Sequence, residues 1–183
     1  PDGAGPTATT DRLVMGPALT VPYRCNFATD DQFALWNVTD ANNDEYTWKR
    51  ETTLAAAYYS YNEDGETGGD DWLVSSPIHL EKNKIYRLKF KLQSYDVGYP
   101  EKVAVHLGTG ASVAEQTTLL GDYEVESNTF VEYKVILPER LESGNYHISF
   151  HCHSEPYMFI LYVTDVLLEE VSEGVLSGVV TNG

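Results

Sequence analysis

Hydrophobic and polar side chains alternate along much of the chain. In the segment IYRLKFKL (85–92) every second residue is apolar, and the residues between them in its middle are cationic. The same period occurs in four other segments: LTVPYRCNF (19–27), KVAVHL (102–107), FVEYKVIL (130–137) and YHISFHC (146–152). A period of two is typical of a β-strand with one buried face and one wet face. These segments therefore predict strands.

One further segment, MFILYVTDVLLEEV (158–171), is apolar on both faces and predicts a strand in the middle of a sandwich. Turn-forming residues lie between the strands, in NEDGETGGDD, EKNK, GTGAS and ESGN. Only residues 29–36 and 112–120 suggest short helical pieces. The absence of a βαβ rhythm favours an all-β fold, an antiparallel jelly-roll β-sandwich.

The chain length of 183 residues suits one domain, which we expect over residues 19–171. Residues 1–18 and 172–183 have the small, polar composition of linkers, and we expect them to join this domain to other modules of a longer protein. No apolar run approaches the roughly 18 residues that a membrane helix needs, and no signal peptide is recognisable. The net charge of −16 disfavours nucleic acid and anionic membranes as partners.

The two cysteines, Cys25 and Cys152, both fall on the apolar phase of their strands. One interpretation is a pair of buried free thiols that pack as small hydrophobic side chains. The other is a disulfide between the first strand and a late one, which would require the two strands to be close neighbours.

The segment DANNDEYTW (40–48) places oxygen-bearing side chains at alternate positions: Asp40, Asn42 and Asp44. With Glu51 at the twelfth position, this spacing matches an EF-hand loop. However, the sixth position holds Glu45 where that loop needs glycine, and the flanks are strand-like. A calcium ion held in a loop of the sandwich and a polar hairpin without metal both stay open.

A second acidic cluster lies in the glycine-rich segment that follows, at Glu63, Asp64, Glu66, Asp70 and Asp71. These carboxylates either collect a cation or point separately into water. Asp165 lies inside an apolar run, where a carboxylate is costly unless it is hydrogen-bonded or bound to metal. We therefore predict a buried structural role for Asp165.

Histidines and tyrosines are the remaining candidates. His147, His151 and His153 share one face of a strand and could hold zinc with Glu155 or His106, but no spacing fixes a third ligand, so we expect them to face solvent. Four tyrosines are candidates for ligand contact through stacking on sugars or anchoring of a protein: Tyr59, Tyr61, Tyr95 and Tyr99.

Several blocks occur in an order that resembles the cleaved-adhesin (choice-of-anchor J) family of bacterial extracellular modules. They are VPYRCNF, DANNDEYTW, DDWLVSSPIHLEKNKIYRLKFKL, YPEKVAVHLGTG, GNYHISFHCHS and LYVTDVLLE, spread over about residues 19–170. The resemblance implies a jelly-roll sandwich related to galactose-binding-like and MAM-like domains, secretion, structural calcium and no catalysis.

The family's calcium-binding block corresponds to Asp40, Asn42 and Asp44, but its glycines are replaced by Asn43 and Glu45. An acidic residue usual after the first strand is Ala28 here, and a later pair of aspartates keeps only Asp165. The expected calcium ligands are Asp40, Asn42, Asp44, Asp71 and Asp165.

Together these features predict a non-catalytic adhesion or binding module of a secreted or cell-surface protein, flanked by other extracellular modules. Its expected partner is a host or matrix protein or a glycan, and membrane insertion is not expected in this stretch. One alternative is a carbohydrate-binding module that targets an attached hydrolase to polysaccharide. Another is a hydrolase that uses the acidic loop around Asp70 and Asp71.

Overall fold

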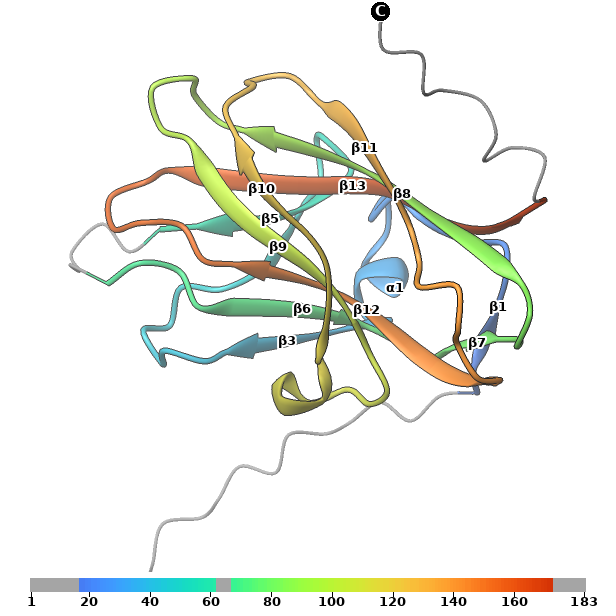
Figure 1. Ribbon diagram of the computed structural model, residues 1–183. Coiled ribbons are helices and arrows are strands. Elements are labelled where there is room, and N and C mark those ends of the chain that lie inside the picture. Colours follow the sequence, from blue (N-terminus) through green and yellow to red (C-terminus); the bar gives the residue numbers. More distant parts are fainter. Residues whose placement is uncertain (1–16, 62–66, 173–183) are drawn as a thin grey trace, which may run out of the picture.

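The computed structural model describes residues 17–61 and 67–172, and these form two packed β-sheets (Figure 1). The seven-stranded sheet consists of β1 (Leu19–Thr20), β3 (Trp36–Asp40), β6 (Asp71–Ser75), β7 (Ile78–Leu80), β9 (Glu101–Gly108), β10 (Thr118–Val125) and β12 (Gly144–Cys152). The six-stranded sheet consists of β2 (Tyr23–Cys25), β4 (Lys49–Glu51), β5 (Ala56–Ser60), β8 (Ile85–Ser94), β11 (Val131–Ile136) and β13 (Ile160–Val171).

The strand pairs are antiparallel except for β1 with β7. In the seven-stranded sheet, β12 lies centrally, between β9 on one side and β6 with β7 on the other. In the six-stranded sheet, β13 holds the same position between β8 and the pair β2 and β5. The predicted all-β sandwich is therefore confirmed, and 158–171 does supply a central strand.

The alternating apolar positions meet between the sheets. On β8 the burial alternates strictly, with Tyr86, Leu88, Phe90 and Leu92 turned inward. Phe150 of β12 contacts Phe90 across the interface, with ring centroids 5.3 Å apart, and contacts Trp36 at 5.9 Å. Rings of this size bury enough apolar surface to dominate the stability of a sandwich core.

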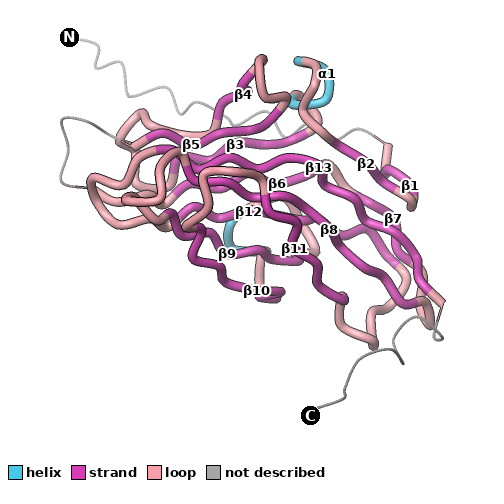
Figure 2. The backbone as a smooth tube through the Cα atoms, turned by 90° about the horizontal axis from the view of Figure 1, so that it is seen from above, coloured by secondary structure: helices cyan, strands magenta, loops and turns pink. Residues whose placement is uncertain are grey.

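Helical structure is confined to two short pieces in the described residues, drawn in cyan in Figure 2. The expected piece at 29–36 is present as α1 (Asp30–Phe33), which Thr29 caps by accepting the amide hydrogen of Gln32. The helix expected over 112–120 is wrong beyond the turn η1 (Val113–Glu115). From Thr118 the chain pairs with β9 instead, because pairing satisfies its backbone in the sheet.

The two cysteines are free and buried, which corrects the disulfide alternative. Cys25 lies on β2 of one sheet and Cys152 on β12 of the other. Burial raises the pKa of both thiols, so they pack as small apolar groups.

Candidate functional site

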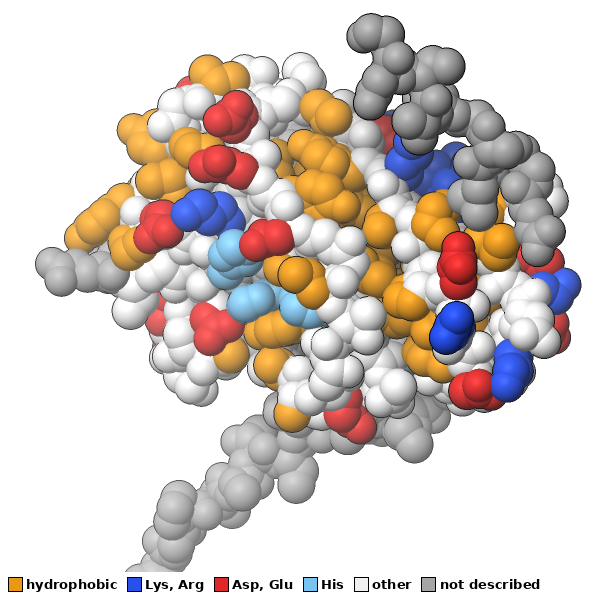
Figure 3. All heavy atoms as spheres, in the orientation of Figure 1, with side chains coloured by type: hydrophobic (Ala, Val, Ile, Leu, Met, Phe, Trp, Pro, Cys, Tyr) orange, Lys and Arg blue, Asp and Glu red, His pale blue; other side chains and the backbone are white. Residues whose placement is uncertain are grey.

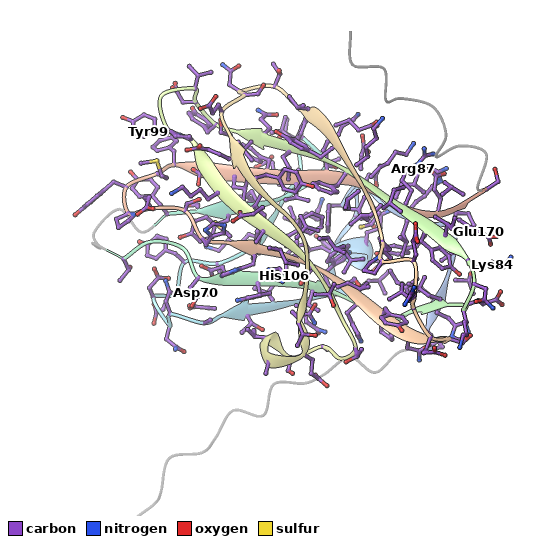
Figure 4. The ribbon with its side chains drawn as sticks, in the orientation of Figure 1. Asp70, Lys84, Arg87, Tyr99, His106 and Glu170 are labelled. Carbon is purple, nitrogen blue, oxygen red and sulfur yellow. The ribbon has the colours of Figure 1, made fainter. Side chains whose placement is uncertain are left out.

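The loops that join β8 to β9 and β12 to β13 lie at one end of the sandwich (Figure 1). Both loops carry exposed aromatic side chains. Tyr95 is 53% exposed, Tyr99 46% and Tyr157 52%. Tyr99 is labelled at this end in Figure 4. Exposed rings held on a rigid scaffold are the residues that most often anchor a ligand or a protein partner.

Phe159 packs against two of these rings, those of Tyr95 and Tyr99, and against Tyr61. Its ring centroid lies 4.9 Å from that of Tyr95, 5.7 Å from that of Tyr99 and 5.4 Å from that of Tyr61. We call these four residues, Tyr61, Tyr95, Tyr99 and Phe159, the aromatic cluster. Because the four rings come from three separate chain segments, the tertiary fold alone creates this continuous surface.

A buried carboxylate fixes the segment that carries Phe159. Glu101, the first residue of β9, is fully buried, and its carboxylate accepts the hydroxyl hydrogen of Ser154 at 2.5 Å and the amide hydrogen of Phe159 at 2.6 Å. Burial raises the pKa of Glu101, and the two donors offset part of that effect. Glu101 therefore fixes the backbone at Phe159, whose ring contacts the other three rings of the aromatic cluster.

Three of the four predicted ligand tyrosines belong to this cluster, but Tyr59 does not. Tyr59 is 1% exposed and packs against Trp48 inside the sandwich, so the prediction of a ligand contact for Tyr59 is wrong. The reason is strand alternation, which turns Tyr59 inward. Sequence reasoning missed Phe159, although it is the second residue of the strand predicted over 158–171 and follows Tyr157 by two positions.

A second feature of the same end of the sandwich is an acidic corner. Asp40 of β3 and Asp71 of β6 are direct cross-strand partners. The side-chain amide of Asn42 donates to the carbonyl oxygen of Gly68 at 2.9 Å, and Asp44 accepts the hydroxyl hydrogen of Thr67 at 3.1 Å. The structure thus brings four of the five predicted calcium ligands together.

The side-chain oxygens in this corner differ in whether a described residue donates a hydrogen bond to them. Asp40 accepts the backbone amides of Asp44 and Glu45, at 3.3 and 2.9 Å. In contrast, Oδ1 of Asp71 and Oδ1 of Asn42 are buried without a hydrogen-bond partner among the described residues. Burial, with the nearby charges of Asp40 and Asp44, raises the pKa of Asp71 to about 7. A buried acceptor without a donor is costly, and a cation would relieve that cost.

The donor set of this corner suits a hard cation. Calcium accepts carboxylate, amide, hydroxyl and backbone carbonyl oxygens in flexible geometry. No group of three or more His, Cys, Asp or Glu side chains within 17–61 and 67–172 is arranged to hold a metal. A calcium ion here would therefore depend on amide oxygens such as that of Asn42 and on the buried hydroxyl of Thr47, which lies beside Asp71 and opposes the rise in its pKa. The strands that flank the loop exclude an EF-hand.

Asp165 does not belong to the acidic corner, and its predicted buried role is wrong. It is exposed and forms an ion pair with Lys91 at 2.8 Å. A β-bulge in β13 turns it outward, with φ at 51°.

Of the acidic residues predicted to cluster in the glycine-rich segment, the structure describes Asp70 and Asp71. Glu63, Asp64 and Glu66 lie outside the described residues. Asp70 contacts Nε2 of His151 at 2.8 Å on the outer face of the sheet, whereas Asp71 is buried on the inner side. Asp70 and Asp71 lie on opposite sides of the sheet, so these two carboxylates do not form the facing pair that glycoside hydrolysis uses.

The histidines form a packed layer on the outer face of the seven-stranded sheet, visible as a pale blue group in Figure 3. His151 stacks on Trp72 with ring centroids 4.0 Å apart, and burial lowers the pKa of His151. His153 is bound to Asp122 at 2.8 Å. His147 is buried against the carbonyl oxygen of Ser75 at 2.6 Å, so the expectation that it faces solvent is wrong.

This layer does not form a zinc site. His151 and His153 each bind a different carboxylate, and His147 is held by the backbone. His106, labelled in Figure 4, lies beside Trp72 at a centroid distance of 5.1 Å. The histidine rings therefore cover Trp72 and leave little of its face open to a ligand.

The fold is similar to solved binding domains. The K1 cleaved adhesin domain of Lys-gingipain from Porphyromonas gingivalis W83 matches with a TM-score of 0.67 and 19% identity, covering 82% of this chain and 98% of that one. The K3 domain of the same protein matches with a TM-score of 0.64 and 19% identity, covering 80% and 96%.

A carbohydrate-binding module provides another match. The CBM22-1–GH10 portion of xylanase 10B from Clostridium thermocellum, solved with xylohexaose, has a TM-score of 0.56 and 12% identity, covering 87% of this chain and 29% of that one. No protein-family model matches the sequence, and no curated protein matches it. The sequence resemblance to cleaved adhesins is therefore confirmed at the level of the fold. No helix in the described segments is long and apolar enough to span a membrane.

Proposed function

We propose that this chain is a non-catalytic, extracellular adhesion module that binds a protein or glycan through its aromatic cluster. The observation that supports this most directly is the exposure of Tyr95 and Tyr99 on loops that Phe159 and the buried Glu101 hold in place. Such a surface recognises a partner without a titrating centre, because stacking and apolar contact provide the affinity. The module would act within a larger secreted or cell-surface protein.

A panel of immobilised matrix proteins and glycans would test this proposal. We expect the double variant Tyr95→Ala/Tyr99→Ala to lose at least roughly tenfold in affinity for the partner that the native chain binds. Leu119→Ala is the control, because Leu119 is also a half-exposed apolar side chain but lies on β10. Full affinity in the double variant, with an unchanged melting temperature, would contradict the proposal.

A second candidate is a carbohydrate-binding module that targets an attached hydrolase to polysaccharide. The fold similarity to a xylanase-linked module favours it. Affinity electrophoresis on neutral polysaccharides separates the two candidates. Retardation that the double tyrosine variant abolishes would support the carbohydrate-binding module, and binding to matrix protein alone would support the adhesin.

We further propose that calcium stabilises the acidic corner. The partnerless oxygens of Asp71 and Asn42 and the charge of the corner support this proposal. Calcium bound only to the native state raises stability with the logarithm of its concentration. We expect the melting temperature to rise with added calcium and to fall with chelator.

Variants would locate the calcium effect. Asp71→Asn should abolish the calcium response, whereas Asp165→Asn should retain it because Asp165 lies away from the corner. An identical melting temperature of the native chain in chelator and in calcium would show that no stabilising site exists.

A further inference from the structure

The outer face of the six-stranded sheet is basic, although the protein as a whole is strongly acidic. The chain has 12 Lys and Arg residues against 28 Asp and Glu residues. Five of the cations project from this one face, from β2, β8 and β11: Arg24, Arg87, Lys89, Lys91 and Lys134. Alternation along β8 places its three cations at every second residue, opposite the buried core positions.

The strand register brings three of these cations into one row. Lys134 of β11 is the direct partner of Lys89 on β8, Lys89 pairs with Leu167 on β13, and Leu167 pairs with Arg24 on β2. Neighbouring strands lie about 4.8 Å apart, so the row crosses four strands within about 15 Å. Like charges directly opposite one another, such as Lys89 and Lys134, destabilise a sheet, and Glu169, 3.5 Å from Lys89, offsets part of this repulsion.

Acidic side chains on the sheet neutralise only part of this charge. Glu169 pairs with Arg87 at 2.6 Å and lies 3.5 Å from Lys89. Asp165 pairs with Lys91 at 2.8 Å, and Glu132 of β11 is the cross-strand partner of Lys91. In the described part of the chain, Arg24 and Lys134 have no carboxylate partner within 4.0 Å, and both are exposed.

A groove of about 470 Å³ lies along this row. Three cations line it, Arg24, Lys89 and Lys91, against two carboxylates, Glu132 and Asp165. The side-chain amides of Asn26 and Gln32 complete its polar lining. The volume falls within the range of sites for small ligands. Among the described residues that line the groove there is no aromatic ring, and aromatic anchors are what a protein partner would need for a stable interface.

We infer that this groove binds an anionic oligosaccharide that carries carboxylate or sulfate groups. The cations would provide charge-assisted hydrogen bonds to those groups, and Asn26 and Gln32 would bind sugar hydroxyls. The net charge of the molecule does not prevent this, because charges beyond about 8 Å are largely screened at physiological salt. The groove is a site additional to the aromatic cluster.

A backbone-matched set of polymers tests the inference: dextran, carboxymethyl dextran and dextran sulfate. We expect affinity electrophoresis at 0.15 M salt to show retardation by at least one of the two anionic polymers and none by dextran. Retardation by the carboxymethyl polymer alone would identify a carboxylate ligand, and retardation by dextran sulfate alone a sulfate ligand. Higher salt should weaken both.

Variants separate the groove from general electrostatics. Arg24→Gln/Lys134→Gln should weaken binding at least roughly tenfold, since it removes two cations that have no partner in the described residues. Lys82→Gln/Arg140→Gln changes the net charge equally in two loops outside the groove and should bind as the native chain does. Glu132→Gln, which removes an anion from the groove lining, should bind more tightly.

Three results would overturn the inference: no retardation by either anionic polymer, equal retardation by dextran, or equal weakening in the two double variants. Polyglutamate binding as tightly as the best anionic dextran would overturn the assignment to a glycan. The Tyr95→Ala/Tyr99→Ala variant should keep its affinity for the anionic polymer. Failure of the groove and failure of the aromatic cluster are therefore distinguishable.

Discussion

At the scale of single residues, the two buried carboxylates in the described part of the chain differ in how their oxygens are satisfied. Glu101 accepts two hydrogen bonds and fixes the segment of Phe159. Asp71 has one oxygen without a donor among the described residues. The protein itself therefore supplies the hydrogen bonds that the Glu101 carboxylate needs. The Asp71 oxygen that lacks a donor is what supports the calcium proposal.

The pH dependence of stability should report on Glu101. Because burial raises its pKa above the usual 4.5 in the folded state, its contribution to stability is present at low pH and is lost as the pH rises through the folded pKa. We expect the unfolding free energy of the native chain to fall relative to that of Glu101→Gln from about pH 4.5 upward. Urea denaturation of both proteins at several pH values measures the difference, and parallel curves would contradict the prediction.

A pair of tyrosine substitutions should separate the core from the aromatic cluster. Tyr59→Ala should lower the unfolding free energy by about 3–5 kcal/mol because it leaves a cavity between the sheets. Tyr95→Ala should change it by less than about 1 kcal/mol, since that ring is half exposed. Denaturant titration tests both, and equal costs would show that Tyr95 is also structural.

At the scale of elements, the bulge in β13 explains why one strand serves two partners on the same side. β5 pairs with β13 as far as Val163, and β2 pairs with it from Val166. Between them the hydroxyl of Thr164 donates to the carbonyl oxygen of Ala55 at 2.6 Å, which satisfies a backbone group at the gap. The bulge also turns Asp165 toward Lys91, and both side chains line the groove on the outer face of the six-stranded sheet.

The backbone at the bulge should discriminate between substitutions. With φ at 51°, Asp165 occupies the left-handed region, which asparagine tolerates and a β-branched residue does not. We expect Asp165→Val to be about 1–2 kcal/mol less stable than Asp165→Asn. Both variants lose the ion pair with Lys91, so their comparison isolates the backbone effect. Equal midpoints in urea would contradict it.

At the scale of the whole molecule, the acidic surface and the basic groove lie on one small sandwich. The net charge of −16 favours self-repulsion in the folded state. The groove concentrates cations on a single sheet face, away from the histidine layer on the other face. The molecule therefore offers two chemically different surfaces in addition to its aromatic end.

Salt should stabilise the protein. Raising sodium chloride from 0.01 to 0.1 M shortens the screening length from about 30 to about 10 Å, which weakens repulsion among the carboxylates. We expect the melting temperature to rise by a few degrees in chelator-treated protein, where calcium cannot contribute. A melting temperature that falls or stays constant would show that local ion pairs outweigh the overall repulsion.

The sequence by itself determined the sandwich. Strict alternation in residues 85–92 and the doubly apolar run 158–171 each leave one favourable arrangement, because a strand must bury its apolar face and pair its backbone. The inward positions of Phe150 and Cys152 followed from the same period. The helix expected at 112–120 failed because its apolar pattern was weak and sheet pairing prevailed.

Only the tertiary structure decided which residues come together at each site. Asp40 and Asp71 became neighbours through strand register, and the aromatic cluster was completed by Phe159 from a third segment. A single bulge turned Asp165 outward, and no periodic pattern reveals a bulge. The physical reason is that alternation specifies which face a side chain occupies, whereas which side chains meet depends on pairing between strands far apart in the chain.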